Sequence, residues 1–203
     1  MTIALPAARL NGTMSVERAL AIRRSVRDFS ATSLTLSQIS QLLWAAQGIT
    51  NENGFRTAPS AGATYPLEVY LVAGKVEELA PGIYRYNPRE HALELVMSGD
   101  IRAALSSACF GQEWVDSAPI SVVISAVFER TTRRYGKRGI QYVHMEVGHA
   151  AQNIYLQATA LNLGTVIVGA FDDNLVMKVM RLPHDEIPLA VLPVGHPTGK
   201  PLF

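Results

Sequence analysis

The chain has 203 residues, of which 48% are hydrophobic, so it can bury a sizeable core and disorder is not the default expectation. Its formal net charge of +1 gives no reason to expect a nucleic-acid or membrane partner. Cys109 is the single cysteine, which excludes an internal disulfide and a cysteine-based zinc site and favours a reducing, cytoplasmic location.

The N-terminal third predicts two helices followed by a long loop. Ser15 can cap a helix that runs to about Arg24. Thr35 and Gln38 match a capping box that opens a second helix, and Gly48 is of the residue type that commonly ends one. Residues 50–65 are rich in Asn, Gly, Pro and Ser. Long loops in compact domains are often functional, so this segment is a candidate for binding.

The rest of the chain alternates irregularly between helical and β-prone segments, which predicts an α+β layout. Strands are predicted at residues 68–73, 83–86, 93–97, 120–128, 165–171 and 189–194. Helices are predicted at residues 99–109, 142–163 and 173–182, with Asp172 or Asp173 as the cap of the last. Pro193 should restrict the last strand to an edge or a strand end, because proline has no N–H to donate.

The helix at residues 142–163 carries apolar residues on more than one side. We expect it to contact its own core on one side and a partner subunit on another. By contrast, the apolar run at residues 120–128 is about half as long as a membrane span requires, and we interpret it as a buried strand.

Three segments carry candidate chemistry. Residues 23–27 (Arg-Arg-Ser-Val-Arg) place three guanidinium groups and a hydroxyl where a helix ends, a set that can bind phosphate. The same cations also suit a helix C-terminus, where the helix dipole favours them. Residues 56–70 contain small residues that allow a flat ligand to approach the backbone, or simply form a turn. Residues 163–173 contain Gly164 and Gly169 and would present bare N–H groups, or form an ordinary strand-to-helix connection.

In this order and spacing, the three segments resemble the nitroreductase superfamily, and the resemblance covers about residues 15–197. Further motifs resemble its azoline-oxidase-like branch, which contains peptide thiazoline and oxazoline dehydrogenases. They are Gln112-Glu113-Trp114, Ala118-Pro119, the stretch from Glu129 to Gly136, and Glu146-x-Gly148-His149 with the following Ala-Ala-Gln-Asn.

The resemblance implies a single domain over residues 1–203, with a central, mostly antiparallel sheet flanked by helices. It also implies an intertwined homodimer with two FMN molecules in its interface. By motif, the phosphate and ribityl chain would be held by Arg23, Arg24, Ser25 and Arg27, and the flavin bound mainly to the other subunit by Pro59, Ser60, Ala61 and Gly62. The flavin ring would lie against Ile167, Val168, Gly169 and Ala170, with a backbone N–H near N5, and the C-terminal phosphate-side segment would supply Gly195, His196 and Lys200.

The implied activity is FMN-dependent hydride transfer from NAD(P)H to a nitroaromatic, a quinone or a similar acceptor, in ping-pong order. A peptide azoline dehydrogenase is one alternative, and a non-catalytic flavin-binding protein with a blocked flavin face is another. The chain departs from the family at Ala63, where many relatives have Asn, and at Ile167, where Pro is frequent. Where azoline oxidases have a Lys-Tyr pair, this chain has Arg134-Tyr135, and arginine stays protonated. Tyr135 alone is therefore the candidate proton-transfer residue.

Two other groups of ionisable residues stand out in the sequence. His144 and His149 lie about 140° apart around a helix, so they cannot face one ion, and no metal site is expected. The basic residues between 130 and 138 would share one helical face, which we interpret as a solvated face or a lid.

Overall fold

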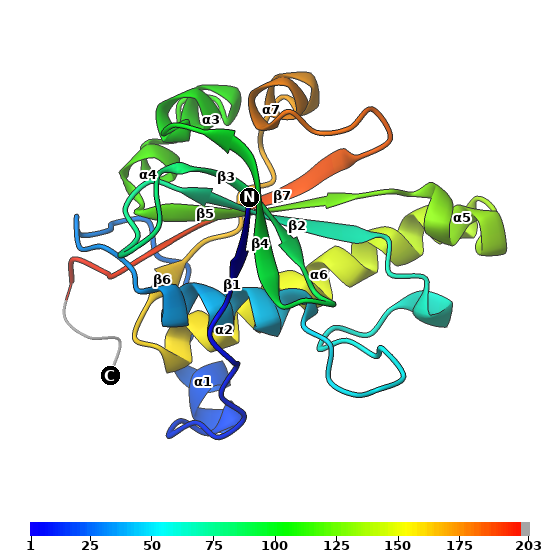
Figure 1. Ribbon diagram of the computed structural model, residues 1–203, viewed down its shortest axis with the longest axis horizontal. Helices are drawn as coiled ribbons and strands as arrows, with labels where there is room; N and C mark the ends of the chain where they lie inside the picture. Colours follow the sequence, from blue (N-terminus) through cyan, green and yellow to red (C-terminus); the bar gives the residue numbers. More distant parts are fainter. Residues whose placement is uncertain (200–203) are drawn as a thin grey trace.

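A seven-stranded sheet forms the centre of the computed structural model, which describes residues 1–199 (Figure 1). The strand order is β1-β4-β3-β2-β5-β7-β6, and each pairing between these strands is antiparallel. The strands are β1 (Thr2–Ala4), β2 (Leu67–Ala73), β3 (Gly82–Asn87), β4 (Ala92–Ser98), β5 (Ile120–Ala126), β6 (Gly164–Thr165) and β7 (Ile187–Gly195). The predicted α+β fold with an antiparallel sheet is confirmed.

Helices cover both faces of the sheet (Figure 1). They are α1 (Val16–Ile22), α2 (Leu36–Gln47), α3 (Arg102–Ala108), α4 (Glu113–Ser117), α5 (Glu129–Tyr135), α6 (Arg138–Ala160) and α7 (Asp173–Met180), and a short 3₁₀ helix, η1 (Ala61–Ala63), lies in the long loop. Successive residues of β2 point to opposite faces. Val69 and Leu71 join the core under α2 and α6, whereas Tyr70 and Val72 join the core under α3, α4 and α7.

The predicted helix starts are confirmed because their signals are local. Ser15 Oγ accepts the N–H of Arg18 at 3.1 Å, and Asp172 accepts that of Leu175 at 2.9 Å. Thr35 and Gln38 form the expected capping box. A cap satisfies N–H groups that the helix itself leaves unpaired, and each signal therefore lies within four residues of its effect.

Two strand predictions were wrong. The strand expected at 165–171 consists only of β6 and an isolated bridge between Val168 and Val191, because the N–H of Ile167 turns away to the Tyr155 hydroxyl. Pro193 was expected at an edge or strand end, but it lies inside β7, which pairs with both β5 and β6. The carbonyl of Pro193 accepts a hydrogen bond from the Thr165 hydroxyl at 2.8 Å, so the backbone of Pro193 faces β6. Because β6 is only two residues long, no backbone acceptor of β6 is left unpaired by the lack of an N–H at Pro193.

The basic segment does not form one helical face. Gly136, at φ +56°, separates α5 from α6, and α6 begins at Arg138 rather than near residue 142. The short strand β1 and the helix α4 were not predicted. Ile154 is fully buried against the chain's own core, so this side of α6 does not face a partner. Within residues 1–199, no helix combines the length and apolar character needed to cross a membrane.

Candidate functional site

Tyr155 connects two of the predicted segments. Its hydroxyl lies 3.1 Å from Ser25 Oγ and accepts the backbone N–H of Ile167 at 2.8 Å. The Arg23 guanidinium lies over its ring, with Cζ 5.1 Å from the ring centroid. Residues 23–25 and 167 are far apart in sequence, and α6 brings them together through one buried phenol. We call Arg23, Ser25, Tyr155 and Ile167 the Tyr155 cluster.

Other predicted residues adjoin this cluster. Val26 donates its N–H to the Thr165 carbonyl at 2.9 Å, which places residues 23–27 beside the strand that leads to Ile167. The Arg27 guanidinium lies over the Trp114 ring at 5.5 Å. Ser30 donates its N–H to the His196 carbonyl at 2.8 Å, so the Gly195-His196 segment runs alongside the same region. Lys200 lies outside the described residues.

Arg24 behaves differently from its neighbours. Its Nη1 donates to the carbonyls of Ala21 and Arg23, at 3.1 and 2.8 Å. These are carbonyls at the end of α1, so Arg24 makes the interaction that is favourable for a cation at a helix C-terminus. Arg23 and Arg27 form no ion pair within residues 1–199, which leaves both charges available.

The N–H groups at residues 167–170 are not equivalent. That of Ile167 is bound to Tyr155, and that of Val168 is donated to the Val191 carbonyl at 2.8 Å. Gly169 and Ala170 are exposed, and their N–H groups bond to no acceptor within the described part of the chain. Among residues 1–199, a Cβ at Gly169 would meet no atom within 4 Å, so no part of the described chain covers this backbone.

Residues 59–62, which we call the Gly62 loop, lie elsewhere. Gly62 adopts φ +60°, and a Cβ there would come within 2.5 Å of the Tyr135 hydroxyl. The positive φ favours glycine here, and a larger residue would also displace the ends of the α5 side chains. The Ser60 hydroxyl accepts the N–H of Tyr65 at 2.9 Å. The structure thus brings Tyr135, the candidate proton-transfer residue, against the Gly62 loop.

Glu146 is buried behind this loop. It is 2% exposed, and its Oε1 has no hydrogen-bond partner within residues 1–199. Burial raises the pKa of Glu146 to about 7, against the lowering effects of the Ser60 hydroxyl and the Arg56 charge. A carboxyl group in this state can hold or release a proton near neutral pH.

The Tyr155 cluster and the Gly62 loop lie on opposite sides of α6. Glu146 and Tyr155 are nine residues apart on this helix, which corresponds to about 14 Å along its axis and about 180° around it. Both side chains are buried, each against its own set of partners. Helix α6 therefore stands between the two regions of one chain.

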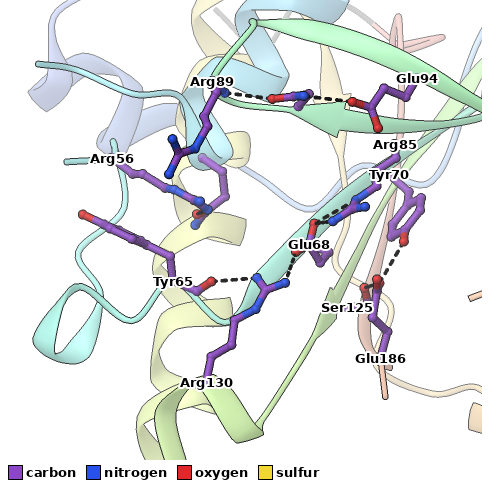
Figure 2. Close-up of polar contacts among 12 residues, drawn as sticks. Arg56, Tyr65, Glu68, Tyr70, Arg85, Arg89, Glu94, Ser125, Arg130 and Glu186 are labelled. Carbon is purple, nitrogen blue, oxygen red and sulfur yellow. Dashed lines mark hydrogen bonds and ion pairs between the residues drawn. The ribbon is translucent and has the colours of Figure 1, made fainter. Parts of the chain in front are cut away.

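Helix α5 is anchored to the sheet by a buried carboxylate. Glu68 on β2 pairs with Arg130 of α5 at 2.6 Å and with Arg85 of β3 at 2.8 Å (Figure 2). Arg130 also donates to the Tyr65 carbonyl at 3.1 Å. These contacts fix the helix that carries Tyr135. No group of three or more potential metal ligands occurs within residues 1–199.

Sequence reasoning missed several of these residues. Tyr155 gave no local signal, because its role depends on two segments that meet only after folding. Trp114 and Glu146 stand in the motifs quoted for the azoline-oxidase-like branch, but no role was assigned to them. The unusual burial of a charged residue, visible only in the structure, is what distinguishes Glu146.

The known proteins that this chain resembles settle its family. The model of the nitroreductase family matches residues 20–196. The chain belongs to the nitroreductase family. This membership confirms the prediction of an FMN-dependent oxidoreductase of nitroreductase type. A candidate nitroreductase of Methanocaldococcus jannaschii is 47% identical over 182 residues, which cover 90% of this chain and 91% of that protein.

Solved structures of nitroreductase type share the fold. A candidate nitroreductase from Ralstonia eutropha superposes with a TM-score of 0.85 at 32% identity, over 98% of this chain and 90% of that one. A chain of the Escherichia coli microcin synthetase McbBCD complex, solved with truncated pro-MccB17 bound, gives a TM-score of 0.79 at 26% identity. That match covers 96% of this chain and 76% of the other.

Proposed function

We propose that this nitroreductase-family protein works as a homodimer that binds FMN between its subunits. Arg23, Arg27 and Ser25 of one subunit would hold the phosphate and ribityl chain, and the Gly62 loop of the other would contact the same flavin. The observation that carries the proposal is the placement of the Tyr155 cluster and the Gly62 loop on opposite sides of α6. Two predicted flavin-contacting regions that α6 separates within one chain can meet across a dimer.

The Tyr155 cluster and the residues beside it fit such a ligand. Arg23 and Arg27 have no acidic partner within residues 1–199, and the buried Trp114 Nε1 beside Arg27 has no acceptor there. Arginine pairs favourably with phosphate, and an unpaired indole N–H is a donor that a ligand can use. Gly169 and Ala170 supply the free N–H groups for the ring edge, and of the four residues predicted there, these two suit that role.

FMN would supply the redox chemistry, taking a hydride from NAD(P)H and passing it to a nitroaromatic, quinone or similar acceptor in ping-pong order. The protein positions this reaction. Tyr155 fixes the Ile167 backbone, and the exposed Ile167, Gly169 and Ala170 leave the face before them open. A purely storage or interaction role, whose hallmark would be a blocked flavin face, stays the third alternative.

A peptide azoline dehydrogenase is the second candidate, favoured by the structural likeness to a chain of the McbBCD complex. Tyr135 lies against the Gly62 loop, where it could transfer a proton in either reaction. Arg134 donates to the Gly62 carbonyl at 3.4 Å, and its permanent charge excludes it as a base. We therefore favour the reductase hypothesis over the azoline dehydrogenase hypothesis.

The decisive experiment is to purify the chain, release its ligand by denaturation and identify it by chromatography. Yellow protein that releases FMN supports the proposal, and colourless protein that takes up no added FMN refutes it. Anaerobic bleaching then separates the two candidates. NADH or NADPH should reduce the flavin of a reductase rapidly, whereas a thiazoline peptide should do so in an azoline dehydrogenase. A neighbouring cyclodehydratase gene with a short precursor-peptide gene would favour the second.

A further inference from the structure

A polar cavity of about 190 Å³ lies beside β2 and β3, away from the Tyr155 cluster. Its charged lining consists of Arg56, Arg85, Arg89, Glu68 and Glu94 (Figure 2). Three positive charges against two negative ones leave a formal net charge of +1. The space is large enough for a small organic ion.

The acidic residues of this cavity do not neutralise all of its arginines. Glu68 is shared by Arg85 and Arg130, at 2.8 and 2.6 Å. Glu94 accepts instead from the neutral amide of Asn87 at 2.8 Å. Neither Arg56 nor Arg89 forms an ion pair within residues 1–199. Within the described residues, neither Arg56 nor Arg89 therefore has a carboxylate bonded to its guanidinium, although the charges of Glu68 and Glu146 act on Arg56 from farther away.

The cavity also holds buried donors without acceptors. Arg56 Nη1 donates to Gln47 Oε1 at 2.8 Å, and this bond orients the Gln47 amide, because the reverse orientation would set two donors against each other. Gln47 is 1% exposed and lines the cavity, yet its Nε2 has no partner in the described structure, and neither has Arg56 Nε. Buried donors are normally paired, so both indicate a missing acceptor.

The two arginines approach the cavity from different elements. Arg56 lies in the long loop, where its guanidinium is stacked 4.4 Å from the centroid of the Tyr65 ring. Arg89 lies in the turn between β3 and β4, and Figure 2 shows its guanidinium directed toward Arg56. Both side chains line the same cavity, so one anion in it can contact both.

We propose that this cavity binds a small molecule through its carboxylate group, which Arg56, Arg89 and Gln47 would hold. A planar carboxylate matches the fork of a guanidinium and can accept from several donors at once. Its single charge balances the net charge of the lining. A phosphate of charge near −2 would face added repulsion from Glu68 and Glu94, so we expect discrimination against it.

The test is a titration of the full chain with ¹³C-labelled acetate, in which the broadening of the acetate NMR signal measures binding. The buffer contains no other carboxylate or phosphate, and chloride keeps the ionic strength constant. We expect saturable binding, weakened about tenfold in Arg89→Gln, which loses one charge-assisted contact. Gln47→Leu, which keeps the volume but removes the amide donor, should weaken it as well. Lys75→Gln removes one exposed positive charge elsewhere and should leave the affinity unchanged.

Arg89 is exposed, so Arg89→Gln should fold like the parent, and thermal unfolding checks this. Three results would overturn the proposal. Acetate could fail to saturate the protein, Arg89→Gln could bind it as well as the parent does, or inorganic phosphate could displace acetate at equal concentration. The last result would indicate a general anion site without preference for carboxylates.

Discussion

The hydroxyl of Tyr155 accepts the backbone N–H of Ile167 at 2.8 Å, and this bond ends the strand that the local sequence favours. Beyond it only Val168 still pairs with β7 in the described structure, and Gly169 and Ala170 face solvent. A single buried side chain on α6 thereby creates the open backbone that we assign to the flavin ring.

Tyr155→Phe tests this role. The substitution leaves the Ile167 N–H and the Ser25 hydroxyl without their partner, and we expect the free energy of unfolding to fall by roughly 1–3 kcal/mol. FMN affinity should fall by about tenfold, because residues 167–170 lose their anchor. Urea unfolding and fluorescence titration with FMN measure the two effects. Tyr84→Phe, which removes a bond to the Ala80 carbonyl far from the site, should lower stability without changing FMN affinity.

Arg23→Glu and Arg27→Glu should each weaken FMN binding at least about a hundredfold, since each replaces a charge-assisted bond by repulsion from a phosphate. Lys75→Glu is the matched charge reversal on an exposed turn and should change little. Fluorescence titration at fixed ionic strength gives the affinities. Parent-like binding in both arginine variants would show that these residues serve only the end of α1.

Glu146 should make the stability of the protein depend on pH. Folding raises its pKa from the ordinary 4.5 to about 7, because burial disfavours the charged form. The folded state therefore binds more protons between these values, and the stabilisation is complete below about pH 4.5 and is lost as the pH rises through about 7. The full loss should be on the order of 3 kcal/mol, because each pKa unit between 4.5 and about 7 corresponds to roughly 1.4 kcal/mol.

The matched variant is Glu146→Gln, which keeps the shape of the side chain and removes its titration. Urea unfolding should show that the free energy of unfolding of the parent, relative to that of the variant, falls between about pH 5 and about pH 8. Glu186, whose pKa burial also raises, is unchanged in both proteins and cancels in this comparison. Equal slopes for parent and variant would rule out Glu146 as the titrating group.

Glu68→Gln should loosen α5. Arg85 and Arg130 both lose their charged partner, which should cost about 2 kcal/mol of stability, because the carboxylate is buried while the arginines are partly exposed. Hydrogen exchange should accelerate in α5 more than in α3, which lies on the other face of the sheet. Unchanged exchange in α5 would mean that the contact between Thr64 and Thr131, at 2.8 Å, is sufficient to hold the helix.

FMN binding and dimerisation should be coupled. A monomer would expose Val16 and Leu20 of α1 and Met145 of α6, each more than half exposed here, and would hold only part of the flavin. A ligand that binds the dimer alone stabilises the dimer by mass action. Analytical ultracentrifugation of a dilution series should show dissociation of the apoprotein at higher concentrations than of the FMN-loaded protein. A stable monomer that binds FMN one-to-one with full affinity would contradict the shared site.

The sequence by itself determined the parts that depend on neighbouring residues. The caps at Ser15, Thr35 and Asp172 act over three residues, and the strand β5 follows from a mostly apolar, β-prone run. The motifs, taken together in sequence order, indicated the nitroreductase family, which the family match confirms, and the alternation of segments indicated an α+β layout. The candidate flavin residues were also named from these motifs, and their roles stay predictions.

Only the tertiary structure decided how distant residues meet. The end of the strand after Thr165 depends on a hydroxyl on α6, and the tolerance of β7 for Pro193 depends on the shortness of its neighbour β6. Neither partner is close in sequence, so no local preference reveals them. The burial of Glu146, and the lack of an ion pair at Arg56 and Arg89 within residues 1–199, likewise arise from packing. Packing sets the dielectric surroundings and the partners of each charge, and these decide what an ionisable side chain can do.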